Sequence, residues 1–237
     1  MTLEEMEQKI AALELALAKQ QAVPQIQNCM GRYVYMHTGG HHTDCVQCFA
    51  NGDPDLSIEI GPMGVFRGPD AAYRVYHIAH NAFEGDRIGF LAEHTLTTPV
   101  IEVADDLQTA KALWISPGHE TSIEPEGPDP TWMWGRYAMD FKNVNGEWKI
   151  WHFQMFPTFR CNYYKAWTDT VPFDEVIHQH PEENIPSVPG AEPDGPTTFF
   201  EEYSPTRAMK YWPQPPAPYQ TFEGTQSMVG APPEGIL

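Results

Sequence analysis

Residues 132–159 read WMWGRYAMDFKNVNGEWKIWHFQMFPTF, and this stretch decides the fold. Apolar or aromatic side chains alternate with polar ones along most of it, which is the period-two pattern of half-buried β-strands. Asn145-Gly146 separates two such runs and is a strong signal for a tight hairpin turn. The stretch therefore predicts two antiparallel strands, Trp132–Val144 and Trp148–Phe159.

The same period extends upstream of this hairpin. It predicts strands at Leu91–Val103 and Thr109–Ser116, joined by a turn at Asp105-Asp106, and a shorter strand at Ser57–Ile60. These segments do not alternate with helices, which argues against a doubly wound parallel sheet.

Helical spacing dominates the N-terminal part of the chain. Apolar residues recur every three or four positions from Leu3 to about Thr38, with a break near Pro24, which predicts two helices or one kinked helix. Short helices are expected after His42 and after Gly68-Pro69-Asp70. The predicted fold class is α+β: a cone in which a curved antiparallel sheet packs on N-terminal helices.

The C-terminal part differs in composition. Most of the 23 prolines lie beyond Pro172, and the segments from Thr170 onward lack periodic apolar positions. Their many aromatic residues exceed what a purely solvated linker needs. We therefore expect a cone domain at residues 1–169 and, at residues 170–237, an extended Pro-rich arm that packs on the domain or on a neighbouring subunit.

Charge and composition restrict the partners. The net charge of −18 repels phosphate backbones and anionic lipid headgroups, so neither nucleic acid nor a membrane surface is an expected partner. No apolar run approaches the roughly 20 residues that span a bilayer, and the charged N-terminal helix does not resemble a secretion signal. We expect a cytoplasmic protein whose four cysteines are reduced and form no disulfide.

Four segments resemble one family in order and spacing: GRYVYMHTGGHHTDCVQCFA (31–50), GVFRGPDAAYRVY (64–76), HTLTTPVIEVADDLQTAKALW (94–114) and WGRYAMDFKNVNGEWKIWHF (134–153). They resemble SnoaL-like proteins of the nuclear-transport-factor-2-like superfamily. The resemblance implies a cone enclosing one pocket for a small molecule. The superfamily includes dehydratases, isomerases, cyclases, dehydrochlorinases and non-catalytic binders, so the fold does not fix the activity.

The layout also resembles a narrower group, the γ-formaldehyde lyases that act on lignin-derived biaryl diols. The shared features are the additional N-terminal helix and the aromatic, proline-rich C-terminal arm. No single motif carries this likeness.

The resemblance implies catalytic residues. Dehydratase relatives carry a histidine in the pattern His-x6-Ile-x-Val, which here is His94, and an imidazole can exchange protons near neutral pH. The alternative is a core histidine bonded to a backbone carbonyl. Tyr33 matches a tyrosine that binds substrate oxygen in those relatives, or else is a buried structural tyrosine. The aspartate that orients the histidine is replaced by Thr38, and His37, Asp44 or another acid are the candidate substitutes.

Other residues are expected to bind substrate. His119 lies near the position of a second histidine in scytalone dehydratase, or else in an exposed loop. Alternation along the strands turns Trp114, Tyr137, His152 and Phe156 inward, which gives an aromatic lining suited to a flat ligand. The same alternation places Trp132, Trp134 and Trp151 on the outer face, where they predict a homo-oligomer, a dimer or a trimer.

A metal site and a cofactor site are not expected. Cys45 and Cys48 lie near His37, His41 and His42, but a zinc site normally has a second ligand pair at typical spacing, and cysteines at i and i+3 mark a buried helix face. The chain contains no nucleotide-binding glycine motif.

These observations favour a cofactor-independent lyase that acts on a hydroxylated aromatic compound by general acid–base chemistry. The specific hypothesis is loss of formaldehyde from a lignin-derived biaryl diol to give a stilbene. The alternatives are a dehydratase, isomerase or cyclase of a polyketide- or steroid-like ring, and a binding protein without catalysis.

Overall fold

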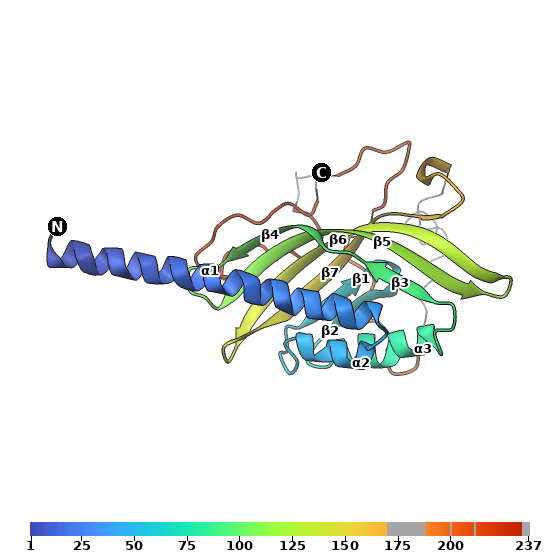
Figure 1. The fold of residues 1–237 in the computed structure, drawn as a ribbon, viewed down its shortest axis with the longest axis horizontal. Helices are drawn as coiled ribbons and strands as arrows, with labels where there is room; N and C mark the ends of the chain where they lie inside the picture. The colour runs from blue at the N-terminus through green and yellow to red at the C-terminus, as the bar shows by residue number, and fades with distance from the viewer. Residues whose placement is uncertain (170–187, 200, 211, 234–237) are drawn as a thin grey trace.

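The computed structural model describes residues 1–169, 188–199, 201–210 and 212–233 (Figure 1). The helical elements are α1 (Leu3–Thr38), α2 (His42–Cys45), η1 (Val46–Cys48), η2 (Gly61–Met63), the π-helix η3 (Tyr73–His80), α3 (Asn81–Glu84) and η4 (Trp167–Asp169). The strands are β1 (Ser57–Ile60), β2 (Gly64–Arg67), β3 (Leu91–His94), β4 (Thr97–Val103), β5 (Thr109–Glu124), β6 (Gly127–Val144) and β7 (Glu147–Asn162).

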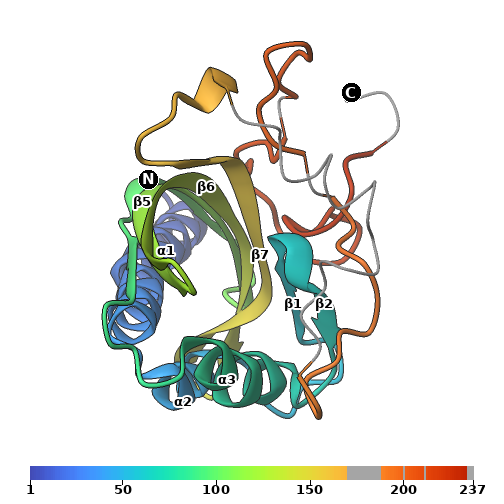
Figure 2. The ribbon, with the colours of Figure 1, turned by 90° about the vertical axis from the view of Figure 1, so that its right-hand side faces the viewer.

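Within these residues the seven strands form one sheet in the order β2-β1-β7-β6-β5-β3, and β4 also pairs with β5. Only the pair β1–β7 is parallel. The long strands β5, β6 and β7 curve around the interior, with α1 on one side and α2 and α3 across one end (Figure 2). This is the predicted α+β class, with a curved, mostly antiparallel sheet packed on helices.

The predicted hairpin is confirmed. Glu147 pairs with Val144, and Asn145 and Gly146 both have positive φ, 54° and 90°. A two-residue turn with two positive φ angles matches the right-handed twist of the strands that it joins. Asn and Gly tolerate this backbone conformation better than other residues.

The extent or number of several elements differs from the prediction. α1 is a single helix that continues through Pro24, because its buried side chains at Ala22 and Ile26 pack on either side of the proline and stabilise both turns. Residues 91–103 form two strands, β3 and β4, and β4 itself has an irregularity between Thr97 and Val100, where Thr98 has φ 48°. β5 continues to Glu124, well beyond the predicted end.

The core lies between α1 and the inner face of the sheet. α1 buries one face along its C-terminal half, formed by Ala22, Ile26, Met30, Tyr33 and His37. This face belongs to the same cluster as strand residues such as Phe153. Each fully buried large apolar side chain contributes about 1.5–3 kcal/mol, so the helix is held by packing rather than by its intrinsic propensity.

The described C-terminal segments pack on the outer face and on one edge of the sheet. Gly195 pairs with Val65 of edge strand β2, which covers part of an otherwise open edge. Trp212 and Met228 form a second cluster with Phe156. The boundary predicted at residue 170 lies outside the described residues, so the division into domain and arm stays a prediction.

Two further observations concern the chain as a whole. None of the described helices is long and apolar enough to cross a membrane. All four cysteines are free thiols.

Candidate active site

A cavity of about 360 Å³ opens between the inner face of the sheet, α1 and the segment that contains η3 and α3. Its apolar lining comes from Ile60, Met63, Phe83, Phe90, Ala92, Met133, Phe153, Met155 and Pro157. Its polar and aromatic lining comes from Tyr33, His37, His80, Glu84, His94, Glu120, Ser122, Tyr137, Arg160 and Glu202. The cavity is therefore mostly apolar, with several convergent titratable groups, which is typical of small-molecule sites.

His94 enters the cavity from the last position of β3. It pairs there with Gly118 of β5. A Cβ at position 118 would lie 2.5 Å from the carbonyl oxygen of Glu93 and 3.3 Å from Nδ1 of His94. The glycine thus provides the space in which the imidazole lies against the sheet. Burial lowers the pKa of His94 below its ordinary value, so the ring is neutral at pH 7 and can accept a proton.

Glu120 is an acidic group close to His94. Its Oε1 lies 3.7 Å from Nε2 of His94, and its Oε2 lies 2.9 Å from Nη2 of Arg160. Both His94 and Glu120 are largely buried, with 10% and 18% of their side chains exposed. The carboxylate raises the pKa of His94, which opposes the larger effect of burial. Glu120 can therefore stabilise the imidazolium that forms when His94 takes up a proton.

Tyr33 contributes a protonated phenol. Its hydroxyl accepts a hydrogen bond from the hydroxyl of Tyr76 at 3.0 Å. The proton of Tyr33 therefore remains available for a second acceptor. Burial raises the pKa of Tyr33 well above its ordinary value, and it also raises the pKa of Tyr137. Both phenols are proton donors at neutral pH.

Four histidines form a cluster beside the cavity. The ring of His37 lies 5.1 Å from the rings of His42 and His80 and 5.3 Å from that of His94. Burial lowers the pKa of His37 well below its ordinary value and that of His80 to about 4, so both are neutral bases at pH 7. In the described part of the chain, Nδ1 of His37 has no hydrogen-bond partner.

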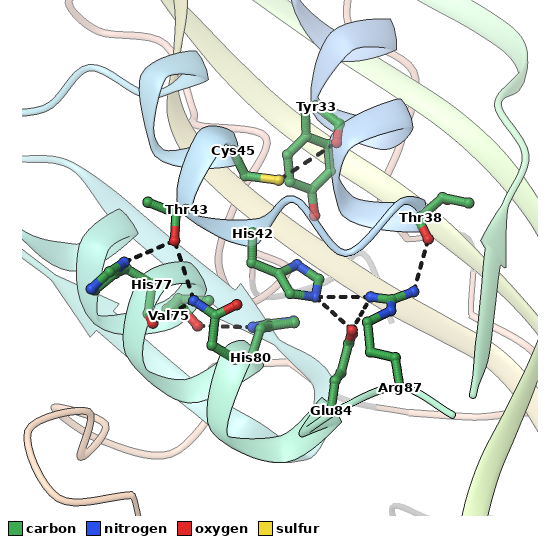
Figure 3. A network of polar contacts seen from close by, with 11 residues as sticks. Tyr33, Thr38, His42, Thr43, Cys45, Val75, His77, His80, Glu84 and Arg87 are labelled. Atoms are coloured by element: carbon green, nitrogen blue, oxygen red, sulfur yellow. Dashed lines mark hydrogen bonds and ion pairs between the residues drawn. The ribbon is translucent and has the colours of Figure 1, made fainter. Parts of the chain in front are cut away.

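Hydrogen bonds and ion pairs hold two members of this cluster, His42 and His80, in place (Figure 3). Nδ1 of His80 lies 2.8 Å from the carbonyl oxygen of Val75 and donates to it, which leaves Nε2 as the acceptor. His42 lies 2.7 Å from the carboxylate of Glu84, which also pairs with Arg87. Despite the four histidines, no group of three His, Cys, Asp or Glu among the described residues is arranged to hold a metal ion.

The SnoaL-like domain family matches residues 20–154, more than half of the chain. The chain belongs to the SnoaL-like family. Members of this family commonly bind small molecules and act on them as enzymes, for example as dehydratases and dehydrochlorinases. No curated protein matches the chain.

This SnoaL-like chain is similar to several solved structures, and LinA, whose TM-score exceeds 0.5, shares its fold. LinA has a TM-score of 0.53 and is 12% identical, over 64% of this chain and 96% of LinA. A hexachlorocyclohexane dehydrochlorinase, LinA-type3 of Novosphingobium barchaimii LL02, has a TM-score of 0.49 and is 13% identical, over 66% of this chain and 99% of its own. A candidate scytalone dehydratase of Novosphingobium aromaticivorans DSM 12444 has a TM-score of 0.49 and is 18% identical, over 65% of this chain and 93% of its own.

The SnoaL-like chain brings the three predicted catalytic residues together. His94, Tyr33 and His37 all line the cavity, and the ring of His37 lies 5.7 Å from that of Tyr33 and 5.3 Å from that of His94. Their catalytic roles stay predictions. Asp44 does not lie at the cavity but is exposed and pairs with His41.

The predicted orientation is wrong for two residues of β7. A β-bulge skips Trp151, because Phe141 pairs with Ile150 while the preceding residue, Asp140, pairs with His152. One extra residue moves every following side chain to the other face of the sheet. Phe153 and Met155 consequently line the cavity, whereas His152 lies on the outer face.

The outer face accounts for the two misplaced side chains. Nδ1 of His152 lies 2.8 Å from a carboxylate oxygen of the fully buried Asp140. Phe156 packs with Phe199 and Trp212 of the C-terminal segments. Neither His152 nor Phe156 lines the cavity.

Of the remaining predicted ligand-binding residues, one lines the cavity and two do not. Tyr137 lines the cavity, as the alternation of β6 predicts, and Trp114 faces inward but lies in the core rather than at the cavity. His119 is exposed on the outer face of β5, against the ring of Trp132. It is not among the residues that line the cavity.

The three outward tryptophans differ in exposure. Trp134 is 39% exposed, but Trp151 is 8% exposed because Phe222 of the C-terminal segment covers it. The homo-oligomer inferred from these indoles stays a prediction.

Sequence reasoning missed Glu120, Arg160, His80 and Glu84. Glu120 lies beyond the predicted end of β5. Arg160 lies in β7, beyond a second bulge that falls opposite Trp134 and Gly135 in the β6–β7 ladder. A detectable signal did exist for Glu120, because alternation from Trp114 through Gly118 places it on the inner face once β5 is extended.

Proposed function

We propose that this SnoaL-like protein is a cofactor-independent lyase that removes formaldehyde from a lignin-derived biaryl diol and gives a stilbene. The observation that carries the proposal is that a neutral His94, with the carboxylate of Glu120 beside it, lies in the same mostly apolar cavity as the phenol of Tyr33. A base with an adjacent carboxylate and a separate protonated acid are the two groups that such an elimination needs.

In the proposed reaction His94 takes the proton of the terminal hydroxyl. The carbon–carbon bond next to that hydroxyl breaks, and formaldehyde leaves. The electron pair of the broken bond forms the new carbon–carbon double bond and expels the benzylic hydroxyl, which takes a proton from Tyr33 and leaves as water. The products are one stilbene, one formaldehyde and one water, with no external oxidant or reductant.

Proton transfer resets the site. After the reaction His94 carries one additional proton and Tyr33 lacks one. The ring of His37 neighbours both rings and is a neutral base, so we expect it to return the proton or to bind a substrate hydroxyl. Each positioned acid or base contributes about 10²–10⁴-fold to the rate.

The cavity supports an aromatic substrate. Its volume of about 360 Å³ lies within the range of small-molecule sites. Phe83, Phe90 and Phe153 offer ring faces and edges to a second aromatic ring. Glu120 and Arg160 form an ion pair within the lining, and Glu120 lies beside His94.

The test is an assay of the protein with a panel of biaryl 1,3-diols, in which formaldehyde and stilbene are measured in the same sample. We expect equal amounts of the two products. Loss of water without formaldehyde would indicate a dehydratase instead, and a rearranged ring without any loss would indicate an isomerase or cyclase.

Paired histidine variants separate catalysis from binding. We expect His94→Gln to reduce turnover by about 10²–10⁴-fold and to leave the dissociation constant of a substrate analogue within a few-fold. His119→Gln is the matched control, because that histidine lies on the outer face of the sheet. A pure binding protein would show affinity for the diols but no turnover in any of the three proteins.

Three parts of the sequence-based hypothesis stay predictions beside this proposal: a cytoplasmic location, a homo-oligomeric state, and a reaction that needs no cofactor.

A further inference from the structure

The N-terminal half of α1 carries an exposed apolar stripe. Its members are Leu3 (69% exposed), Met6 (38%), Ile10 (55%), Leu13 (61%) and Leu17 (58%). The steps between them alternate strictly between three and four residues. This is the a/d spacing of a coiled-coil heptad, in which the apolar seam faces a second helix.

The stripe lies on the part of α1 that projects beyond the rest of the protein (Figure 1). The helix is anchored to the body just after the stripe ends, where Lys19 Nζ lies 2.7 Å from Asp105. The start of the helix is fixed as well, because Thr2 and Glu5 form a capping box. A helix of about 15 residues is marginal in water without tertiary contacts, and an exposed apolar stripe adds to this cost.

The stripe faces away from the body of its own chain. With 3.6 residues per turn, successive residues are rotated by about 100°. On that rotation the stripe, centred near Ile10, lies about 180° around the helix from the buried face near Ile26 and Met30. A second helix laid along the stripe would therefore meet the side of α1 that carries none of its own domain.

We propose that this stripe is the seam of a parallel two-stranded coiled coil between two copies of the chain. Ile10 takes an a position and Leu13 a d position, a combination that favours two strands. The two bodies then lie on opposite outer sides of the helix pair and do not occupy the same space.

The flanking charges select the parallel orientation. Lys9 takes the g position, and Glu7 and Glu14 take e positions. In a parallel pair, Lys9 of each copy faces Glu14 of the second copy, which gives two attractive pairs. In an antiparallel pair the e positions of the two helices face each other, so that glutamates lie against glutamates.

The oligomeric state of the full chain tests the proposal. Sedimentation equilibrium of the wild type is expected to give twice the chain mass of 26.8 kDa. Ile10→Lys is expected to give the monomer mass at the same concentration, with the thermal unfolding transition of the body retained. Ala12→Lys is the matched control, because Ala12 is exposed on the other side of the same helix, and it is expected to remain dimeric.

Three results would overturn this proposal. They are a monomeric wild type across the micromolar range, a wild-type trimer, and an oligomer whose mass Ile10→Lys leaves unchanged. The last result would assign the interface to another surface, such as that of Trp134.

A cysteine placed at the N-terminal end tests the orientation. In a parallel pair the two copies of Leu3→Cys are adjacent at the seam, so oxidised glutathione is expected to convert the variant into a disulfide-linked dimer. The wild type, treated in the same way, controls for its own four cysteines. If Leu3→Cys gives no more covalent dimer than the wild type, the parallel arrangement is wrong.

Discussion

Replacement of Glu120 by glutamine tests the electrostatic basis of the candidate active site. The change removes one negative charge and keeps the size of the side chain. Oε1 of Glu120 lies 3.7 Å from Nε2 of His94, and little of either side chain is exposed. The charge therefore acts on the imidazolium with limited screening by solvent.

The magnitude follows from the geometry. Two unit charges about 4 Å apart attract by about 4 kcal/mol at an effective dielectric constant of about 20. Arg160 lies 2.9 Å from the other carboxylate oxygen and shares the same charge, so we expect about half of this figure, about 2 kcal/mol, to act on His94. A loss of about 2 kcal/mol from the transition state that carries the imidazolium lowers kcat by about 30-fold.

The pH dependence gives a second, independent signature. The proposed base is the neutral form of His94, so activity is present above the pKa of His94 and is lost as the pH falls through it. Glu120 raises this pKa, and its removal therefore moves the acidic limb of the rate profile to lower pH while the plateau falls. A residue that only supported the fold would lower the plateau without moving the limb.

The assay combines an NMR titration of His94 with the profile of kcat against pH, and Glu124→Gln at the exposed end of the same strand is the control. The NMR titration does not depend on the identity of the substrate. An unchanged pKa of His94 in Glu120→Gln, or a plateau as high as that of the wild type, would refute the electrostatic argument.

Three further predictions concern stability. Gly118→Ala is expected to lower the free energy of unfolding in urea by about 1–3 kcal/mol, because the new Cβ would lie 2.5 Å from a carbonyl oxygen of β3. An unchanged free energy of unfolding would contradict the close packing of β3 on β5. Burial lowers the pKa of His80 from 6.5 to about 4. As the pH falls, His80 therefore takes up a proton in the unfolded chain before it does so in the folded one, and the free energy of unfolding decreases by about 3 kcal/mol between pH 6.5 and 4. His80→Asn should reduce this loss when unfolding is measured across that pH range, and an unchanged pH dependence would refute the assignment. Asp140 accepts hydrogen bonds from His152, Ser227 and the backbone of Met228. Asp140→Ala is therefore expected to lower the free energy of unfolding by about 3 kcal/mol and to expose residues 212–233 to limited proteolysis. A cleavage pattern like that of the wild type would contradict this.

Local patterns were sufficient where the backbone is regular. The period-two runs on both sides of Asn145-Gly146 predicted the central hairpin, because each side chain of a regular strand faces opposite to its neighbour. The end of β5 was missed for a local reason. Pro117-Gly118 reads as a loop, but in the structure both residues pair with β6, opposite Trp134 and Met133.

The composition of the candidate site was only partly predictable for the same reason. His94 and Tyr33 lie in regular elements, and both line the cavity. The acid beside His94 could not be found from the spacing around Thr38, because Glu120 comes from a neighbouring strand and is brought close by pairing rather than by sequence. Strand register connects residues that no short motif contains.

The bulge at Trp151 links the two faces of the sheet. Without it, His152 would project into the cavity beside Tyr137, and Phe153 would project outward. With it, the cavity receives an apolar ring, and the imidazole of His152 binds the buried carboxylate of Asp140, to which Ser227 also donates. One inserted residue thus keeps an additional titratable base out of the inner site and at the same time builds the anchor of the C-terminal segment. A bulge that serves both faces constrains the sequence of β7 more strongly than either face alone, because its loss would disturb the cavity and the anchor together.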